Sequence, residues 1–395
     1  MRIGWLEPCD GTMADQPFPS IAFLWSALAA ASTSGMMSAL AGQLAQFGGA
    51  VAKADSPPPK WATANRVVLE LPCMRLREFC AEEHAVPTLI CAPFALHRAT
   101  IADFAPGHSL VRALHGAGLS HICVTDWLSA SPQMRYLSID NYLADLDVAA
   151  DELGGKLDLI GLCQGGWMAL LFAARFPEKV RKLVLAGAPV DIRAGESALS
   201  RLTTQMPLAA FEQLVELGGG RILGDRVLGL WGPRTLDSES VRQLLQVPRR
   251  LGGPALRRLE AEFQKWHATT VDLPGTYYLE VVEWLYKQNR LAAGRLVALG
   301  HRIDLARVRV PLFLLAARDD NVVAPGQVFA TEARVGTAAS EIETAIAPCQ
   351  HLGLFMGART LRTIWPRIAR WLNGKPASPR RSSRSAGPDV GAPPG

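Results

Sequence analysis

The sequence lacks the features that mark several large protein classes. No two of its seven cysteines have the spacing of a metal site, and most lie within apolar runs, which favours buried thiols over a metal centre or a disulfide framework. Basic residues form no cluster, and most of the net charge of +5 comes from residues 374–395, so we expect no nucleic-acid partner. No basic leader precedes the first apolar stretch, as a secretory signal would require, so we expect a cytoplasmic protein.

Residues 17–52 contain no Asp, Glu, Lys, Arg or His. This stretch is rich in Ala, Ser and Gly, and it is poorer in Leu, Ile and Phe than an ordinary membrane span. Three interpretations stay open: a helix packed on its own domain, an amphipathic surface anchor, and a membrane span. Because residues 53–60 include three consecutive prolines, the segment 1–60 is predicted to be helical and to end in a linker.

Beyond residue 60, short apolar runs alternate with helical patterns. The predicted strands are 67–71, 88–92, 121–125, 157–162, 182–186, 311–316 and 341–347, and the predicted helices are 109–116, 139–153, 164–176, 327–335 and 361–372. Such alternation is typical of a mostly parallel sheet covered by helices on both faces. The sequence therefore predicts an α/β core in two parts, residues 61–192 and 306–373.

The alternation stops between these two parts. Residues 193–305 contain helical patterns at 208–217, 241–245 and 256–266, separated by glycine-rich breaks, and no convincing strand. An insertion of this size between strands is expected above their carboxyl ends, where ligands bind, so we interpret residues 193–305 as a helical lid. Residues 374–395 are rich in Pro, Ser, Arg and Gly and have almost nothing to bury, so we expect them to be disordered.

The most informative motif lies at residues 161–166, which read Gly-Leu-Cys-Gln-Gly-Gly between a predicted strand and a predicted helix. This is the form of a nucleophile elbow, Gly-x-nucleophile-x-Gly, with Cys163 in place of serine. The alternative is a buried thiol in a glycine-rich turn, and the strand before and the helix after favour the nucleophile. The glycines are needed because a strand that turns directly into a helix brings neighbouring elements very close. The helix amino terminus would stabilise a thiolate, and the backbone N–H of Gln164 would face a developing oxyanion.

A nucleophile of this kind needs an acid and a base, which follow it in that chain order. Asp320 is the preferred acid because it lies in the loop after the predicted strand 311–316; the alternative is that Asp319 and Asp320 are turn or cap residues. His351 follows the strand 341–347, where the base is expected, and a capping or core histidine is the alternative. Cys349, close to His351 in sequence, is a minor rival nucleophile.

With these residues placed, the sequence resembles the polyhydroxyalkanoate synthase family, acyltransferases of the α/β-hydrolase fold with a cysteine in a Gly-x-Cys-x-Gly-Gly box. The resemblance assigns the nucleophile to Cys163, the acid to Asp320 and the base to His351. The sequence departs from the family at two places. Asn321 occupies a position where many members have a second histidine, and residues 266–270 differ from the motif often found there. Both differences concern which substrate is used. Further similar segments occur in order, at residues 103–111, 125–127, 139–142, 176–180, 188–191, 273–275, 286–291 and 303–305.

The resemblance implies that 3-hydroxyacyl groups move from coenzyme A thioesters to a growing polyester chain. Coenzyme A is then a substrate carrier, and we expect no metal and no further cofactor. A backbone N–H near Phe94 is the expected second oxyanion donor. Relatives often work as dimers and on granule surfaces, so a homodimer and a granule-associated location are expected as well.

Two other classes of function stay open. The same three side chains with water as acceptor give a hydrolase, such as an intracellular polyhydroxyalkanoate depolymerase, an esterase or a thioesterase. A noncatalytic granule or partner-binding protein that has kept the fold is the third interpretation.

Overall fold

The computed structural model describes residues 59–82, 85–231, 235–248 and 251–374. Its main sheet has eight strands in the order β1-β2-β6-β3-β7-β8-β13-β14. Strands β1 and β2 are antiparallel at one edge, and the strands from β6 to β14 run parallel. Because β6 and β7 flank β3 on opposite sides, the strand order reverses at β3, which is where parallel sheets of this kind bind ligands.

Every predicted strand is present in this sheet, and one strand was missed. The strands are β1 (Arg66–Glu70), β2 (Met74–Ala81), β3 (Thr88–Cys91), β6 (His121–Trp127), β7 (Leu157–Leu162), β8 (Val180–Ala186), β13 (Leu312–Ala317) and β14 (Ile342–Ala347). The missed strand, β2, is not a continuous apolar run: buried Met74 and Leu76 alternate with Arg75 and Arg77. This period of two is typical of a strand with one polar face.

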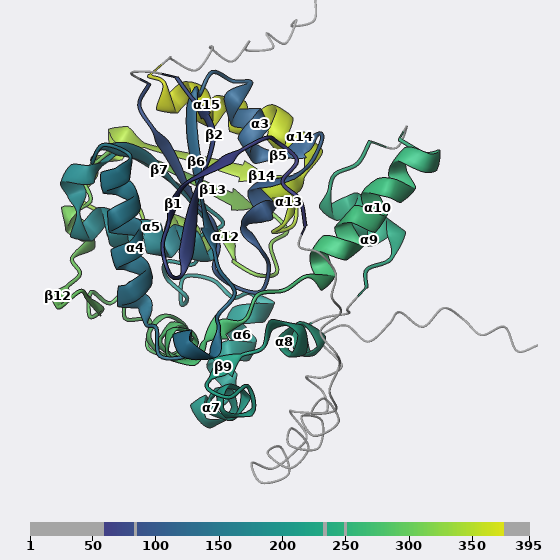
Figure 1. The fold of residues 1–395 in the computed structure, drawn as a ribbon. Coiled ribbons are helices and arrows are strands. Elements are labelled where there is room, and N and C mark those ends of the chain that lie inside the picture. Colours follow the sequence, from purple (N-terminus) through teal and green to yellow (C-terminus); the bar gives the residue numbers. More distant parts are fainter. Residues whose placement is uncertain (1–58, 83–84, 232–234, 249–250, 375–395) are drawn as a thin grey trace, which may run out of the picture.

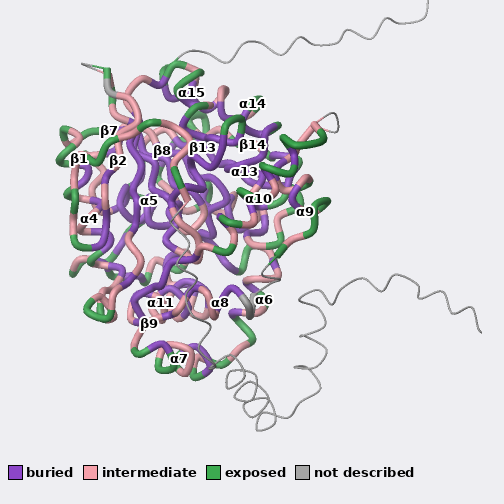
Figure 2. Tube along the Cα trace, turned by 45° about the vertical axis from the view of Figure 1, so that its right-hand side comes forward, coloured by how far each residue is buried: buried purple, intermediate pink, exposed green. Residues whose placement is uncertain are grey.

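Helices cover both faces of the sheet. One face packs against α4 (Ile139–Glu152), α5 (Gln164–Arg175) and α12 (Pro325–Phe329), and the other packs against α3 (Leu110–His115), α13 (Gly353–Met356), α14 (Ala358–Thr363) and α15 (Trp365–Leu372). Figure 1 shows α4 and α5 on one side of the strands and α3, α14 and α15 on the other. The tube in Figure 2 is buried along most of the central strands and along α5. The predicted α/β class is confirmed.

Two helix predictions need correction. The predicted helix 361–372 is divided into α14 and α15 at Ile364, because Pro366 has no N–H and must lie in the first turn of a helix. The predicted helix 327–335 is the shorter α12, which starts at Pro325 and gives way to turns after Phe329. The helices predicted at 109–116, 139–153 and 164–176 agree with α3, α4 and α5 to within a residue or two at each end.

Residues 193–305 form an inserted segment that adds no strand to the main sheet. Its helices are α6 (Ala198–Gln205), α7 (Leu208–Leu217), α8 (Gly224–Trp231), α9 (Ser238–Leu244), α10 (Gly253–Ala268) and α11 (Gly275–Glu280), followed by the π-helical η4 (Val281–Lys287). The expectation of no strand here was wrong in detail, because β9 (Arg221–Ile222) pairs with β10 (Leu273–Pro274) and β11 (Val297–Ala298) with β12 (His301–Arg302). A similar short pair, β4 (Asp103–Ala105) and β5 (His108–Ser109), lies in the core.

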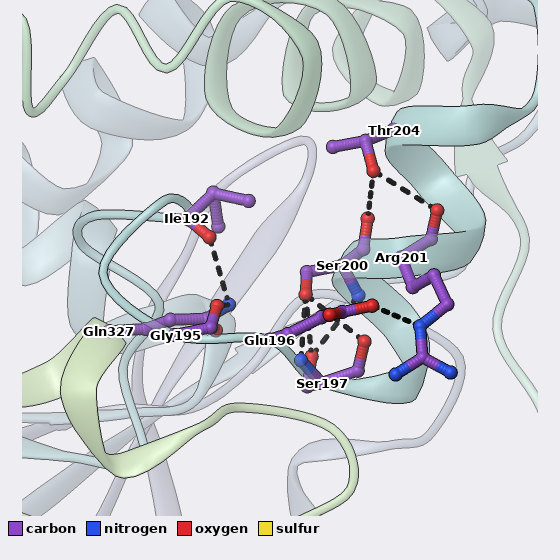
Figure 3. A network of polar contacts seen from close by, with 8 residues as sticks. All are labelled: Ile192, Gly195, Glu196, Ser197, Ser200, Arg201, Thr204 and Gln327. Atoms are coloured by element: carbon purple, nitrogen blue, oxygen red, sulfur yellow. Dashed lines mark hydrogen bonds and ion pairs between the residues drawn. The ribbon is translucent and has the colours of Figure 1, made fainter.

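The first turn of the inserted segment is hydrogen-bonded to the core, as Figure 3 shows in part. Gln327 Nε2 in α12 donates to Ile192 O at 3.2 Å and to Gly195 O at 2.8 Å. Ser197, the N-cap of α6, donates through Oγ to Val322 O at 2.8 Å. The start of the inserted segment is therefore fixed to the loop that follows β13.

A buried carboxylate connects both ends of the inserted segment. Asp191, just before the segment, accepts a hydrogen bond from Asn289 Nδ2 at 2.7 Å and forms an ion pair with Arg334. Burial acts to raise the pKa of Asp191, but the bonds from Asn289 and Arg334 outweigh it and lower that pKa. The family-like segments at 188–191 and 286–291 therefore meet in one charged contact at the base of the insertion. Its action as a lid stays a prediction.

The predicted N-terminal unit, residues 1–60, and the predicted C-terminal tail, residues 374–395, lie outside the described residues except for residues 59, 60 and 374. Within the described ranges, no helix is both long enough and apolar enough to cross a membrane.

Candidate active site

Cys163 lies on a strained turn between β7 and α5. Its φ of 50° is in the left-handed region that residues with a Cβ rarely adopt. A Cβ at Gly165 would lie 2.1 Å from the carbonyl oxygen of Cys91, and one at Gly166 would lie 2.4 Å from Ala188 Cβ. The two glycines therefore let the ends of β3 and β8 approach the turn, which holds Cys163 half-buried at the carboxyl end of the sheet.

The same turn makes Cys163 the N-cap of α5. The N–H groups at a helix amino terminus carry partial positive charge, so the position suits negative charge on sulfur or on an acyl oxygen. The Gln164 side chain accepts a hydrogen bond from Trp167 Nε1 at 2.5 Å, which holds it against the helix. The backbone N–H of Gln164 stays the predicted oxyanion donor.

Phe94 lies in the loop after β3, the strand next to β7. Its buried ring packs against Tyr142 and Tyr277, with ring centroids 4.6 Å and 5.2 Å away. The aromatic contacts fix this loop beside the elbow, since Gly165 approaches Cys91 just before it. A backbone donor near Phe94 stays a prediction that this location favours.

Asp320 and His351 are brought together from two loops 31 residues apart. His351 Nδ1 donates to Asp320 Oδ2 at 2.7 Å, and both side chains are almost fully buried. The other carboxylate oxygen of Asp320 accepts from the backbone N–H groups of Val322 and Val323 at 2.8 Å and 2.9 Å. Asp319 is exposed, and among the described residues its one hydrogen bond runs from its backbone N–H to Cys349 O. Asp320, rather than Asp319, therefore orients the imidazole.

The His351 ring lies beside the elbow. A Cβ at Gly187 would lie 3.1 Å from His351 Cε1, and the preceding residue, Ala186, accepts a hydrogen bond from Cys163 N at 2.9 Å. With Nδ1 bound to Asp320, the buried Nε2 has no hydrogen bond of ordinary geometry to the described residues. Nε2 is thus the atom available to exchange a proton with Cys163 or a substrate.

The charge of His351 depends on both neighbours. Burial acts to lower the pKa of His351, but the Asp320 carboxylate and the Cys163 thiolate outweigh it and raise this pKa well above its usual value. A thiolate at Cys163 therefore favours the imidazolium form of His351. Once the sulfur is acylated, the thiolate no longer raises the pKa of His351, so the ring more readily stays neutral and free to accept a proton at that stage.

Cys349, the rival nucleophile, is in a different environment. It is buried, its sulfur accepts from Thr360 Oγ1 at 3.8 Å, and burial raises its pKa to about 11. A thiol that stays protonated at neutral pH is a poor nucleophile. The surroundings of Cys349 thus favour a structural role.

Two tyrosines near Cys163 were missed from the sequence. Tyr277 in α11 and Tyr286 in η4 are buried. Burial is the main reason why the pKa of each hydroxyl is raised, and nearby negative charges, including that of a Cys163 thiolate, raise it further. Tyr277 also donates to Phe94 O at 3.4 Å. Both come from the inserted segment, so this segment places two buried hydroxyl groups within electrostatic range of the sulfur. The only sequence signal was that Tyr286 begins the family-like segment 286–291.

Replacing Asp320 with asparagine should lower kcat by about 10⁴-fold, because the imidazole then loses the partner that fixes its tautomer. The pKa of His351 should fall without the carboxylate, so the alkaline limb of the pH–rate profile should move to lower pH. Steady-state rates across the pH range test both effects. Asp319→Asn is the matched control and should behave like the unchanged protein; equal losses in both variants would contradict the assignment.

The chain is similar in sequence to proteins named for the synthesis or breakdown of polyhydroxyalkanoates. A family model described as "PHB de-polymerase C-terminus" matches residues 257–375. The "Poly(3-hydroxyalkanoate) polymerase subunit PhaC" of Allochromatium vinosum is 26% identical over 80% of this chain and 88% of its own length. The protein of the same name from Synechocystis sp. is 27% identical over 74% of this chain and 79% of its own length.

A solved structure of Paleococcus ferrophilus monoacylglycerol lipase superposes with a TM-score of 0.51 at 16% identity, covering 76% of this chain and 98% of that one. This likeness supports the fold alone, which is that of the α/β hydrolases. The polymerase relatives match along most of both chains. The chain is therefore a relative of the poly(3-hydroxyalkanoate) polymerases, with the fold of the α/β hydrolases.

Proposed function

We propose that this chain is an acyltransferase that moves 3-hydroxyacyl groups from coenzyme A thioesters to the end of a growing polyester. The main support is a cysteine, rather than a serine, on the elbow beside the buried His351–Asp320 pair. Transfer from one thiol to another exchanges thioesters at little change in free energy. The enzyme-bound thioester then acylates a hydroxyl readily, whereas a serine ester would be a poorer donor.

In the first half-reaction, the Cys163 thiolate attacks the thioester carbonyl carbon of the acyl-CoA. The backbone N–H groups of Gln164 and of the loop near Phe94 stabilise the oxyanion that forms. The bond from carbon to the CoA sulfur breaks, and the His351 imidazolium gives its proton to that sulfur. The products are free CoA, an acyl group on Cys163 and a neutral imidazole.

In the second half-reaction, neutral His351 takes the proton of the hydroxyl at the polyester chain end. The oxygen attacks the acyl carbon, an ester bond forms, and the Cys163 thiolate leaves. The thiolate and the imidazolium are thereby restored for the next acyl-CoA. Each proton and acyl transfer is assigned to a side chain of this protein, so we propose no cofactor other than the CoA of the substrate.

Hydrolysis is the second candidate, favoured by the depolymerase name of the family model that matches residues 257–375. Incubation with 3-hydroxybutyryl-CoA separates a synthase from a thioesterase by the acyl product, since both of these release CoA. We expect polymer as the acyl product. Free 3-hydroxybutyrate would indicate a thioesterase instead, and action only on preformed polyester would indicate a depolymerase; either result would overturn the acyltransferase proposal.

The partners follow from this chemistry. A hydroxyacyl-CoA and a polyester chain are the substrates, and both fit the cytoplasmic or granule-surface location expected from the sequence. A homodimer is proposed on the family resemblance.

A further inference from the structure

Three metal-ligating side chains meet at the start of β6, away from the catalytic residues. Glu78 in β2 is directly opposite Cys123 in β6, and His121 precedes Cys123 by two residues. Opposed residues, and residues two apart on one strand, point to the same face of a sheet. The three potential ligand atoms all lie within 4.8 Å of one another.

The spacing of these atoms already resembles a coordination sphere. His121 Nε2 and Glu78 Oε1 are 3.4 Å apart. Two ligands of a tetrahedral zinc ion, each at about 2.0–2.2 Å from the metal, are separated by about 3.4 Å. A small movement of the Cys123 sulfur or of the His121 ring would complete three corners of a tetrahedron.

The surroundings leave these ligand atoms with few other partners. The side chains of Glu78 and His121 are 10% and 18% exposed, and Cys123 is fully buried. Buried His121 Nε2 has no hydrogen bond of ordinary geometry among the described residues. Arg66 Nε donates to the other carboxylate oxygen, Glu78 Oε2, at 2.5 Å, so it holds the carboxylate from outside and leaves Oε1 facing His121.

We propose that Glu78, His121 and Cys123 bind one divalent cation of the zinc class, with a water as fourth ligand. One sulfur, one imidazole nitrogen and one carboxylate oxygen suit zinc or cobalt(II), whereas calcium and magnesium require oxygen ligands throughout. On binding, the Cys123 thiol releases its proton to solvent, and the thiolate and the carboxylate then present two negative charges to the cation.

The site is structural rather than catalytic. The ligands on β6 occupy its first half, whereas Cys163 follows the last residue of β7, and these strands run parallel with β3 between them. The cation would join β2 to β6 next to the register irregularity between Glu78 and Cys80. No short motif indicates the site, because Glu78 and Cys123 are far apart in sequence.

The test is a cobalt(II) titration of the full chain carrying Cys163→Ala, which removes the elbow thiol as a competing ligand. One equivalent of cobalt should produce thiolate-to-cobalt charge-transfer absorption, and zinc should displace it and raise the thermal unfolding temperature. Cys123→Ser should abolish the band. His121→Gln should weaken zinc binding by at least about tenfold, because even the loss of a residue that only supports a metal ligand lowers metal affinity by about that factor.

Cys80→Ser is the matched control, because Cys80 packs in the core cluster on the opposite face of the same strand pair. It should keep both the band and the zinc-induced stabilisation. The proposal is overturned if no band forms, if Cys123→Ser retains it, or if Cys80→Ser loses it. Should Cys123→Ser fail to fold, the half-buried His121→Gln variant decides: unchanged zinc affinity there would equally reject the site.

Discussion

Replacing Cys163 with alanine should reduce CoA release from 3-hydroxybutyryl-CoA by about 10⁴-fold or more. Without the sulfur no enzyme-bound acyl group can form, and His351 has no thiolate partner. The loss should come without unfolding, because Cys163 is only half-buried and alanine is smaller. Thiol-reagent detection of CoA measures the rate, and circular dichroism checks the fold.

Two variants sharpen this result. Cys163→Ser keeps the shape of the side chain and should still be strongly impaired, because an alkoxide is harder to form and a serine ester is a poorer donor. Cys349→Ala removes the nearby buried thiol and should retain most of the activity. Full activity of the Cys163→Ala variant would show that Cys163 is not the nucleophile. So would a loss of activity in a Cys349→Ala variant that keeps its fold.

Replacing Gly165 with alanine should prevent the chain from folding stably, with a loss of more than about 4 kcal/mol in the free energy of unfolding. The new Cβ would lie 2.1 Å from the carbonyl oxygen of Cys91 and 2.7 Å from that of Ala92. These are backbone atoms at the end of a central strand, so neither can move aside without disturbing the sheet. Urea-induced unfolding followed by tryptophan fluorescence measures the change.

Gly252→Ala provides the control for this substitution. A Cβ at Gly252 meets nothing within 4 Å, and its backbone is extended, so the change should cost less than about 1 kcal/mol. A Gly165→Ala variant with the unfolding midpoint of the unchanged protein would show that the close approach of elbow and sheet is not required.

The sequence predicted the parallel part of the sheet well, because buried parallel strands are continuous apolar runs. It did not predict β2, where Arg75 and Arg77 interrupt the run and only alternate residues face the core. It also did not predict the break at Ile364, although Pro366 was a local signal for it. The local pattern of apolar residues was therefore sufficient to predict most strands and helices of the core.

The site could be predicted only in part. The elbow is a local motif, and Asp320 and His351 follow strands in the expected order, but their contact is a property of the fold. Tyr277 and Tyr286 lie in the inserted segment within electrostatic range of the sulfur. The local sequence of these helices does not indicate which part of the core they contact. The Glu78–His121–Cys123 cluster depends on the register of two antiparallel strands, which spacing along one strand does not show.

The most direct measurement is peptide mass spectrometry of protein quenched in acid after brief exposure to 3-hydroxybutyryl-CoA. A single hydroxybutyryl adduct should appear on the peptide that contains Cys163, and hydroxylamine should remove it, as expected of a thioester. Turnover of the substrate with Cys163 unmodified at every time, or with the adduct on another residue, would contradict the account.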